Sequence, residues 1–258
     1  MKKVFFKTSD SLTLCGIWHI PKTETKKVVI LAHGLTVTKD EDGIFTELAE
    51  ILMQANIAVF RFDFRGHGES GGKSVAMTIA GELLDLHAAI HEVGKQDFES
   101  VGLLGASFGG GIATLFAQDF QTQLQALCLW NPCLNYDHTL INPILPWIAD
   151  RNDIRKQEIK SQGWTTVGSR KFIIGKALYD ELSNTFPYKA LEHIIIPTCI
   201  LHGTADTYVP HEDSNSYANA LMNGEFISIE DGEHGFKKPQ KQREEVLEKT
   251  VAFFKNNL

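Results

Sequence analysis

Short apolar runs alternate with longer amphipathic stretches along most of this chain. Residues 27–32 (KVVILA) form a continuous apolar run rich in β-branched residues, which is typical of a strand that is buried on both faces. Residues 44–55 then place apolar side chains at helical spacing, and the order repeats with a strand at 58–64 and a helix at 77–93. Repeated strand–helix units predict an α/β protein with a mainly parallel sheet and helices on both of its faces.

The rest of the chain continues this alternation. A starting hairpin is expected from strands at 3–8 and 12–19, with its turn at Ser9-Asp10-Ser11. The remaining predicted elements are strands at 101–104, 127–130, 198–201 and 225–229 and helices directly after Ser107, near 212–222 and near 240–255. Together they predict a sheet of about eight strands in a single domain over residues 1–258, because α/β folds often exceed about 200 residues without splitting.

One segment breaks the alternation. Residues 133–196 are irregular, and prolines and large aromatic residues are scattered through them. The segment is too long for an ordinary connection and contains enough aromatic side chains to pack. We expect a small cap that is inserted between the sixth and seventh strands; the alternative is a long surface loop.

Composition and charge narrow the class of protein. Hydrophobic residues make up 43% and charged residues 22%, as in ordinary globular proteins. The net charge of −7 argues against nucleic-acid binding, which calls for clustered Lys and Arg. No stretch approaches the roughly 20 apolar residues of a membrane span, and Lys7, Ser9 and Asp10 interrupt the N-terminal apolar run too early for an export signal. We therefore expect a cytoplasmic protein.

The chain carries no metal or cofactor motif. No cluster of His, Cys and Asp has metal-ligand spacing, and neither GxGxxG nor GxxxxGK(S/T) occurs. The cysteines show no CxxC pattern, and a reducing compartment would keep them as thiols. We expect them to be packing residues: Cys15, Cys128, Cys133 and Cys199. No cofactor and no metal are expected.

The strongest chemical signal is GASFG at 105–109, a G-x-S-x-G pattern around Ser107. It directly follows an apolar strand and precedes a helical stretch, which is the strand–turn–helix context that this pattern needs. A serine at so tight a turn has a strained backbone, and Gly105 and Gly109 leave room for it. We interpret Ser107 as a nucleophile; the alternative is a serine that merely caps the helix.

A serine hydroxyl needs a general base that is held by an acid, and in this context the acid and then the histidine follow the serine along the chain. Asp206 stands in a glycine-containing loop after the strand at 198–201, and is preferred over Asp213, which looks like part of a helix's first turn. His234 lies in a loop with glycines on both sides, and is preferred over His211, which follows a proline and begins a helix. The predicted triad is Ser107, Asp206 and His234.

The same chemistry requires an oxyanion hole, in which two backbone N–H groups point at the developing alkoxide. One is expected from Phe108, the residue after the nucleophile, and the other from Leu35 in the loop His33-Gly34-Leu35-Thr36.

Two further histidines receive a structural interpretation. In RFDFRGHGES at 61–70, Gly66 and Gly68 are expected to shape a turn while Asp63 and Arg65 satisfy buried backbone groups, rather than to form a metal site or a second active site around His67. We expect His202 to pack or to form hydrogen bonds near the loop that carries Asp206.

Five segments together resemble the α/β-hydrolase superfamily: HGLT at 33–36, RFDFRGHGES at 61–70, GASFG at 105–109, LHGTAD at 201–206 and GEHGF at 232–236. Within it the chain is similar to small bacterial carboxylesterases of the feruloyl (cinnamoyl) esterase group. The resemblance implies a cap between the sixth and seventh strands, hydrolysis of aryl or short acyl esters, and the triad and oxyanion hole given above. Members of that group usually carry HGFT and GHSQGG, so the pocket wall beside the serine differs here.

The leading hypothesis is a carboxylesterase that acts on a small-molecule ester, including hydroxycinnamoyl esters, through an acyl-enzyme. A monoacylglycerol lipase or a serine peptidase could use the same triad, and so could an acyltransferase or a perhydrolase. A non-catalytic small-molecule receptor is the alternative from another class, although a receptor has no need for all three groups. A homodimer is left open as the assembly.

Overall fold

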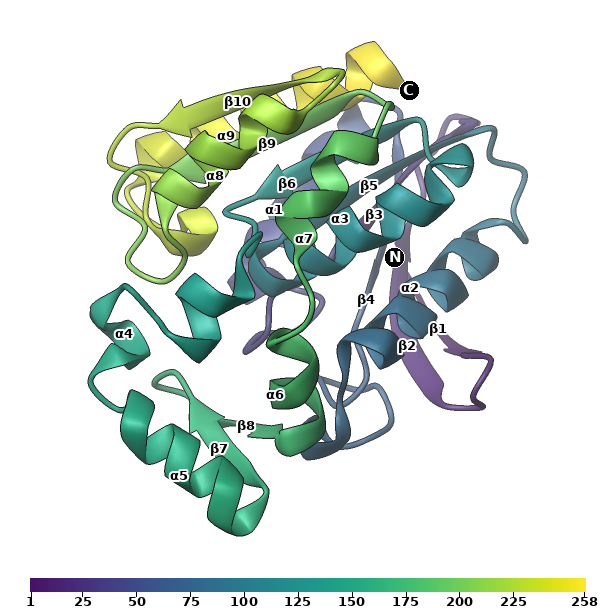
Figure 1. Ribbon diagram of the computed structural model, residues 1–258. Coiled ribbons are helices and arrows are strands. Elements are labelled where there is room, and N and C mark those ends of the chain that lie inside the picture. The colour runs from purple at the N-terminus through teal and green to yellow at the C-terminus, as the bar shows by residue number, and fades with distance from the viewer.

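Eight strands form the central sheet of the computed structural model, which describes residues 1–258 (Figure 1). They are β1 (Lys2–Lys7), β2 (Thr13–His19), β3 (Lys27–Ala32), β4 (Ala58–Phe62), β5 (Ser100–Ala106), β6 (Ala126–Trp130), β9 (Thr198–Gly203) and β10 (Gly224–Ile229). The order across the sheet is β1-β2-β4-β3-β5-β6-β9-β10. The neighbouring strands β4, β3, β5, β6, β9 and β10 run parallel to one another, while β2 is antiparallel to both β1 and β4. The predicted mainly parallel sheet is confirmed.

The inner strands send alternate side chains into two hydrophobic cores. In β3, Val28, Ile30 and Ala32 belong to the core on one face, and Val29 and Leu31 belong to the core on the other. Successive side chains of a strand point to opposite faces, so a strand that is covered on both sides needs a continuous apolar run.

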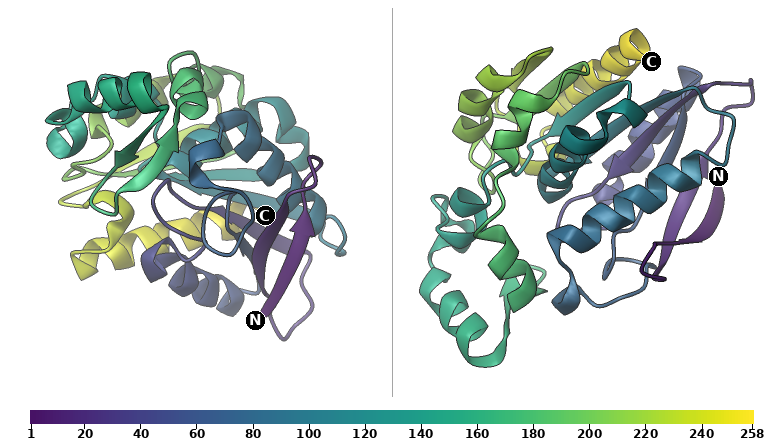
Figure 2. Two further views of the ribbon diagram at one scale, coloured as in Figure 1. Left: turned by 90° about the horizontal axis from the view of Figure 1, so that it is seen from below. Right: turned by 45° about the vertical axis from the view of Figure 1, so that its right-hand side comes forward.

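Helices cover both faces of the sheet (Figures 1 and 2). On one face, α1 (Ile44–Gln54) and α9 (Gln240–Asn257) pack their apolar sides into the same core. On the other face lie α2 (Ile79–Val93), α3 (Ser107–Phe120) and α8 (His211–Tyr217). Across all helices, no stretch combines the length and the apolar character that a membrane crossing requires.

The chain between β6 and β9 forms several short elements. They are α4 (Pro146–Ala149), α5 (Asn152–Gln162), the antiparallel strands β7 (Trp164–Val167) and β8 (Phe172–Gly175), α6 (Lys176–Leu182) and α7 (Pro187–Ala190). The elements from α4 to α6 project from one end of the main body, whereas α7 returns to lie along α3 (Figures 1 and 2). Apolar side chains of this segment, such as Ile148 and Leu178, join the core that contains α2 and α3.

The strand expected at 58–64 is shorter than the apolar run that predicts it. β4 ends at Phe62, although the N–H of Asp63 still donates to the carbonyl oxygen of Cys15 in β2 at 2.9 Å. The N–H of Phe64 donates to Nε2 of His33 at 3.0 Å, which turns the chain away from β3. A side-chain acceptor from the neighbouring strand end therefore sets the end of this strand.

The sheet has one point where its connections diverge. β3 lies in the middle, and the chain passes from it to β4 on one side and then to β5 on the other. In open parallel sheets, such a reversal leaves a crevice at the carboxyl ends of the two central strands. Those ends lead into the loop that begins at His33 and into helix α3, which begins at Ser107.

Candidate active site

Ser107 sits at a sharp turn between β5 and α3. Its φ of 53° is in the left-handed region, which a serine adopts only under constraint. The flanking glycines permit the turn: a Cβ at Gly105 would lie 2.6 Å from the carbonyl oxygen of Gly109, and a Cβ at Gly109 would overlap the carbonyl oxygen of His33. The tight packing of α3 against the ends of β5 and β3 therefore explains the spacing of the G-x-S-x-G sequence.

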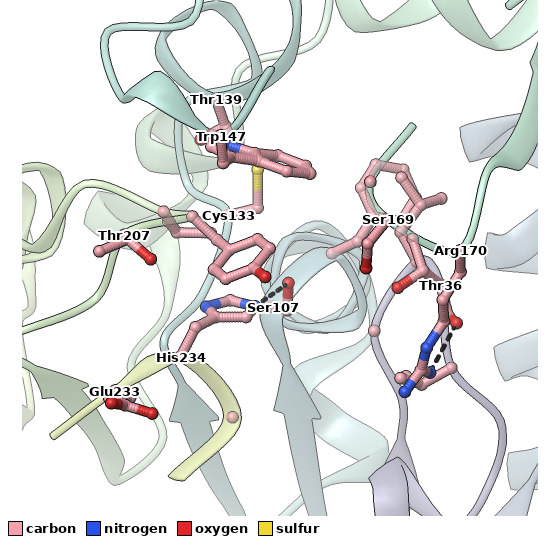
Figure 3. Close-up of a pocket in the computed structure, with 18 of the residues that line it drawn as sticks. Thr36, Ser107, Cys133, Thr139, Trp147, Ser169, Arg170, Thr207, Glu233 and His234 are labelled. Carbon is pink, nitrogen blue, oxygen red and sulfur yellow. Dashed lines mark hydrogen bonds between the residues drawn. The ribbon is translucent and has the colours of Figure 1, made fainter. Parts of the chain in front are cut away.

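The three residues of the predicted triad are joined by hydrogen bonds. Nε2 of His234 lies 3.0 Å from Oγ of Ser107 (Figure 3), and Nδ1 of His234 lies 2.7 Å from Oδ2 of Asp206. The carboxylate can only accept, so the imidazole carries its proton on Nδ1 and leaves Nε2 free to accept from the serine hydroxyl. This arrangement gives the serine a base with the tautomer that proton transfer requires.

Asp206 is held as a carboxylate by several donors. Its Oδ1 accepts from the N–H groups of Tyr208 at 2.7 Å and Val209 at 2.9 Å, and Nε2 of His202 lies 3.3 Å from its Oδ2. Burial raises the pKa of Asp206, but the adjacent His234 and His202 outweigh this effect and hold the pKa well below its usual value. The expectation that His202 forms hydrogen bonds near this loop is confirmed.

His234 has the opposite shift. Burial lowers the pKa of its imidazole, but the charge of Asp206 and the hydrogen bond to it raise the pKa above its usual value. A more basic imidazole is better able to take a proton from an alcohol, provided that it is neutral at the working pH.

The two N–H groups predicted for an oxyanion hole come from the loop after β3 and from the first turn of α3, and both residues lie in the pocket of Ser107. The N–H of Leu35 donates to no group in the chain, and Phe108 is the second residue of α3, so its N–H has no acceptor one turn earlier within the helix. Leu35, Ser107, Phe108 and His234 all line one pocket.

His33 and His67, neither of which was predicted to have a part in the oxyanion hole, fix the loop of Leu35. Nε2 of His33 accepts from the N–H of Phe64, so its Nδ1 carries the proton and donates to the carbonyl oxygen of Gly34 at 2.8 Å. His67 donates from Nε2 to the carbonyl oxygen of Leu35 at 2.6 Å. Because each carbonyl shares its peptide plane with the following N–H, these bonds set the directions of the N–H groups. No spacing rule points to them, although both residues precede a glycine.

The pocket over Ser107 measures about 670 Å³. Its walls combine the loops at the strand ends with residues between β6 and β9, among them Leu140, Trp147 and Arg170. The ring of Tyr208 stacks on His234 with 5.1 Å between ring centres, and the ring of Trp147 packs against that of Tyr208 with 5.0 Å between ring centres. A pocket of this size could enclose a small organic substrate.

The competing acid and histidine lie outside the hydrogen-bonded triad. Asp213 accepts from Nδ1 of His138 at 2.9 Å, and His211 bonds to Oγ of Ser228 at 2.9 Å.

The segment at 61–70 departs in part from its interpretation. Asp63 does accept backbone N–H groups, from Lys39 at 2.7 Å and Glu69 at 2.9 Å. The prediction for Arg65 is wrong: its guanidinium pairs with the carboxylates of Asp85 and Asp10 instead of backbone carbonyls. Asp85 lies on α2, where its buried charge requires a cation.

One group of possible metal ligands also lies here. Cys15, Asp63 and Glu69 bring their ligand atoms together, but the ammonium of Lys39 bonds to Asp63 at 2.7 Å and to Glu69 at 3.1 Å. A lysine therefore supplies the positive charge at this place. All four cysteines of the chain are buried free thiols, and Cys133 also lines the pocket over Ser107.

Comparisons with known proteins agree with this architecture. A family model described as serine aminopeptidase, S33 matches residues 23–163, which is more than half of the chain. The monoacylglycerol lipase of Mycolicibacterium smegmatis is 30% identical over 135 residues, 52% of this chain and 46% of that protein. The human monoglyceride lipase is 24% identical over 220 residues, 74% of this chain and 69% of that protein. The chain thus spans about half the length of the Mycolicibacterium relative.

Among solved structures, Est1E from Butyrivibrio proteoclasticus with bound ferulic acid superposes with a TM-score of 0.80. The superposition covers 98% of each chain at 19% sequence identity. A likeness at this identity concerns the fold, and it establishes the α/β-hydrolase architecture over nearly the whole chain.

Proposed function

Because the chain belongs to the serine aminopeptidase S33 family of α/β-hydrolases, we propose that it is a serine carboxylesterase for small acyl or aryl esters. The observation that carries the proposal is the hydrogen-bonded series Asp206–His234–Ser107, which opens into a pocket of about 670 Å³. A serine in this setting is activated for attack on a carbonyl carbon.

The proposed reaction has two halves. Oγ of Ser107 attacks the ester carbonyl as Nε2 of His234 takes the hydroxyl proton, and the N–H groups of Leu35 and Phe108 bind the oxyanion that forms. Collapse of this intermediate breaks the bond to the alcohol, which leaves with the proton from His234. Water then attacks the acyl-enzyme by the same steps and releases the carboxylic acid and Ser107.

Segment 133–196 is proposed to act as a cap over this site. Its residues Trp147 and Leu140 give the pocket an apolar wall. The cations of the pocket wall, Arg170 and Lys237, both bind the carboxylate of Asp42. Because both cations are already engaged by a carboxylate of the chain, the proposed substrate is a neutral ester rather than an anionic one.

A monoacylglycerol lipase is the second candidate. The supporting observation is that curated relatives matching half or more of this chain bear that name. Such an enzyme would place a long acyl chain in the pocket, so its activity should rise with acyl length, whereas a small-ester carboxylesterase should favour short acyl or aryl groups. The rate of hydrolysis of hydroxycinnamoyl esters is compared with the rates for these two classes of ester.

The test measures steady-state hydrolysis of p-nitrophenyl acetate and butyrate, methyl ferulate and a long-chain monoacylglycerol by wild type and by Ser107→Ala. We expect turnover of at least one short or aryl ester that Ser107→Ala lowers by several orders of magnitude. Ser100→Ala, at the far end of β5, is the matched control and should retain wild-type rates. No turnover of any ester by wild type, or turnover by Ser107→Ala near the wild-type rate, would contradict the proposal.

A further inference from the structure

Glu41 is a buried acidic residue in the pocket that the proposed reaction does not use. It is 5% exposed, it lies on the loop between β3 and α1, and it lines the same pocket as Ser107 and His234. Its φ of 44° is in the left-handed region, so the fold holds this side chain inward at the cost of backbone strain. A strained backbone and a buried acid at one position call for a specific explanation.

The carboxylate of Glu41 holds the loop that carries the proposed oxyanion donor. Its Oε2 accepts from the N–H of Gly34 at 2.7 Å. With this bond, three successive peptide units are each fixed by a side chain: Glu41 binds the N–H of Gly34, His33 the carbonyl of Gly34, and His67 the carbonyl of Leu35.

Little room exists for this loop to move. A Cβ placed at Gly34 would lie 3.2 Å from Cβ of Ser107 and 3.6 Å from both carboxylate oxygens of Glu41. The loop is thus packed between the nucleophile and Glu41. Loss of the carboxylate would leave the buried N–H of Gly34 without an acceptor, and the loop would shift to satisfy it.

Glu41 and His234 line the same pocket, so the charge of each acts on the other. The charged groups around Glu41 are His234, Asp42 and Lys237, and Arg170 neutralises Asp42 from the β7–β8 turn. Burial raises the pKa of Glu41 to about 7, although the N–H of Gly34 and the imidazole of His234 act to lower it. In return, the charge of Glu41 adds to that of Asp206 in raising the pKa of His234.

We propose that Glu41 is a positioning residue of this site, which orients the oxyanion loop through Gly34 and supplies a second negative charge to the imidazole of His234. The proposal rests on the esterase function above, because it assigns Glu41 a part in the same reaction. The two effects are separable, because the hydrogen bond to Gly34 needs only an acceptor oxygen, whereas the effect on the pKa of His234 needs a charge.

Two variants separate these effects. Glu41→Gln keeps an acceptor oxygen on a side chain of the same length and removes the charge. Glu41→Leu removes both the acceptor and the charge, with a side chain of similar volume. Glu50→Gln, an exposed site on α1, is the control for the loss of one negative charge. The measurements are kcat and KM for the best ester across pH 5–9, with thermal unfolding to check the fold.

Glu41→Gln should retain kcat within about threefold on the alkaline side, because the loop is still held. Its acid limb of kcat/KM should move to lower pH by about a few tenths of a unit, because Glu41, whose pKa is about 7, is partly charged where His234 titrates and its removal makes the imidazolium less stable. Glu41→Leu should lose about tenfold or more in kcat with KM changed less than threefold. Glu50→Gln should match wild type in all of these.

An unshifted acid limb in Glu41→Gln would overturn the electrostatic part, and a normal kcat in Glu41→Leu would overturn the positioning part. If Glu41→Leu does not fold, a Glu41→Gln profile identical to wild type still contradicts the proposal. These failures are distinct from failure of the esterase function, which would show as a wild-type protein without turnover on any ester.

Discussion

Replacement of Asp206 by asparagine is the sharpest perturbation of the proposed catalytic machinery. The carboxylate has backbone N–H donors on Oδ1 and ring nitrogens of His234 and His202 on Oδ2. Asparagine keeps only one acceptor oxygen. If that oxygen stays with the backbone donors, the new NH₂ group faces Nδ1 of His234, and two donors oppose each other. The imidazole must then move its proton to Nε2, where it can no longer accept from Ser107.

The expected loss follows from this tautomer. An imidazole that presents N–H to Ser107 is no base, and the charge that stabilised the imidazolium is gone as well. In Ser-His-Asp enzymes this exchange costs about 10⁴-fold in kcat, which corresponds to about 5.5 kcal/mol. We expect a loss of about 10³–10⁴-fold in kcat for Asp206→Asn. KM should change little, since Asp206 is buried beneath His234 and does not line the pocket.

The assay is steady-state hydrolysis of the best ester at pH 8, with circular dichroism and thermal unfolding as checks on the fold. Asp213→Asn is the matched control, because Asp213 is also a buried acid that accepts from a histidine ring, that of His138. It should stay within a few-fold of wild type. A folded Asp206→Asn protein whose kcat stays within tenfold of wild type would refute the reasoning.

Three other predictions follow from the same geometry. The pKa of His234 is raised above its usual value of about 6.5 and the base must be neutral, so kcat/KM should fall as the pH drops through a value above about 6.5. A pH–rate profile whose acid limb lies below about pH 6 would contradict this prediction. Arg170→Ala removes the hydrogen bond from the β7–β8 turn to the carbonyl oxygen of Thr36, so KM should rise severalfold while kcat stays within about threefold of wild type. An unchanged KM would show that this hydrogen bond does not shape the pocket. Gly109→Ala should lower the melting temperature by about 5 °C or more because its methyl group would overlap the carbonyl of His33, whereas Gly94→Ala, with no atom nearer than 3.5 Å, should melt as wild type does.

The parts of the fold that the sequence predicts are those whose signal is local. The run at 27–32 is apolar on both faces because β3 is buried on both faces, and that information lies within six consecutive residues. Ser107 was recognisable for a similar reason: its turn requires glycines at fixed offsets, and these are visible in the chain. The choice of Asp206 and His234 rested on the chain order of strand ends, which a parallel sheet brings to one edge.

Other features depend on contacts that no local pattern contains. One partner of Arg65 is Asp85, which lies twenty residues later in the chain, within α2, and neither position shows which group it will meet. The inward side chain of Glu41 depends on a left-handed backbone that the sequence TKDEDG does not mark. Between β6 and β9, the short elements α4, β7 and β8 are fixed by packing onto the α2–α3 core rather than by their own periodicity. Their existence was not predictable beyond the expectation that the segment packs.

The proposal that His234 activates Ser107 as a nucleophile is tested most directly by covalent labelling of the purified protein with a fluorophosphonate, followed by mass spectrometry of its peptides. We expect one equivalent of phosphonyl group on Oγ of Ser107, formed rapidly in wild type and at least about a hundredfold more slowly in His234→Ala. Modification at another residue, no modification at all, or labelling of His234→Ala at the wild-type rate would contradict it.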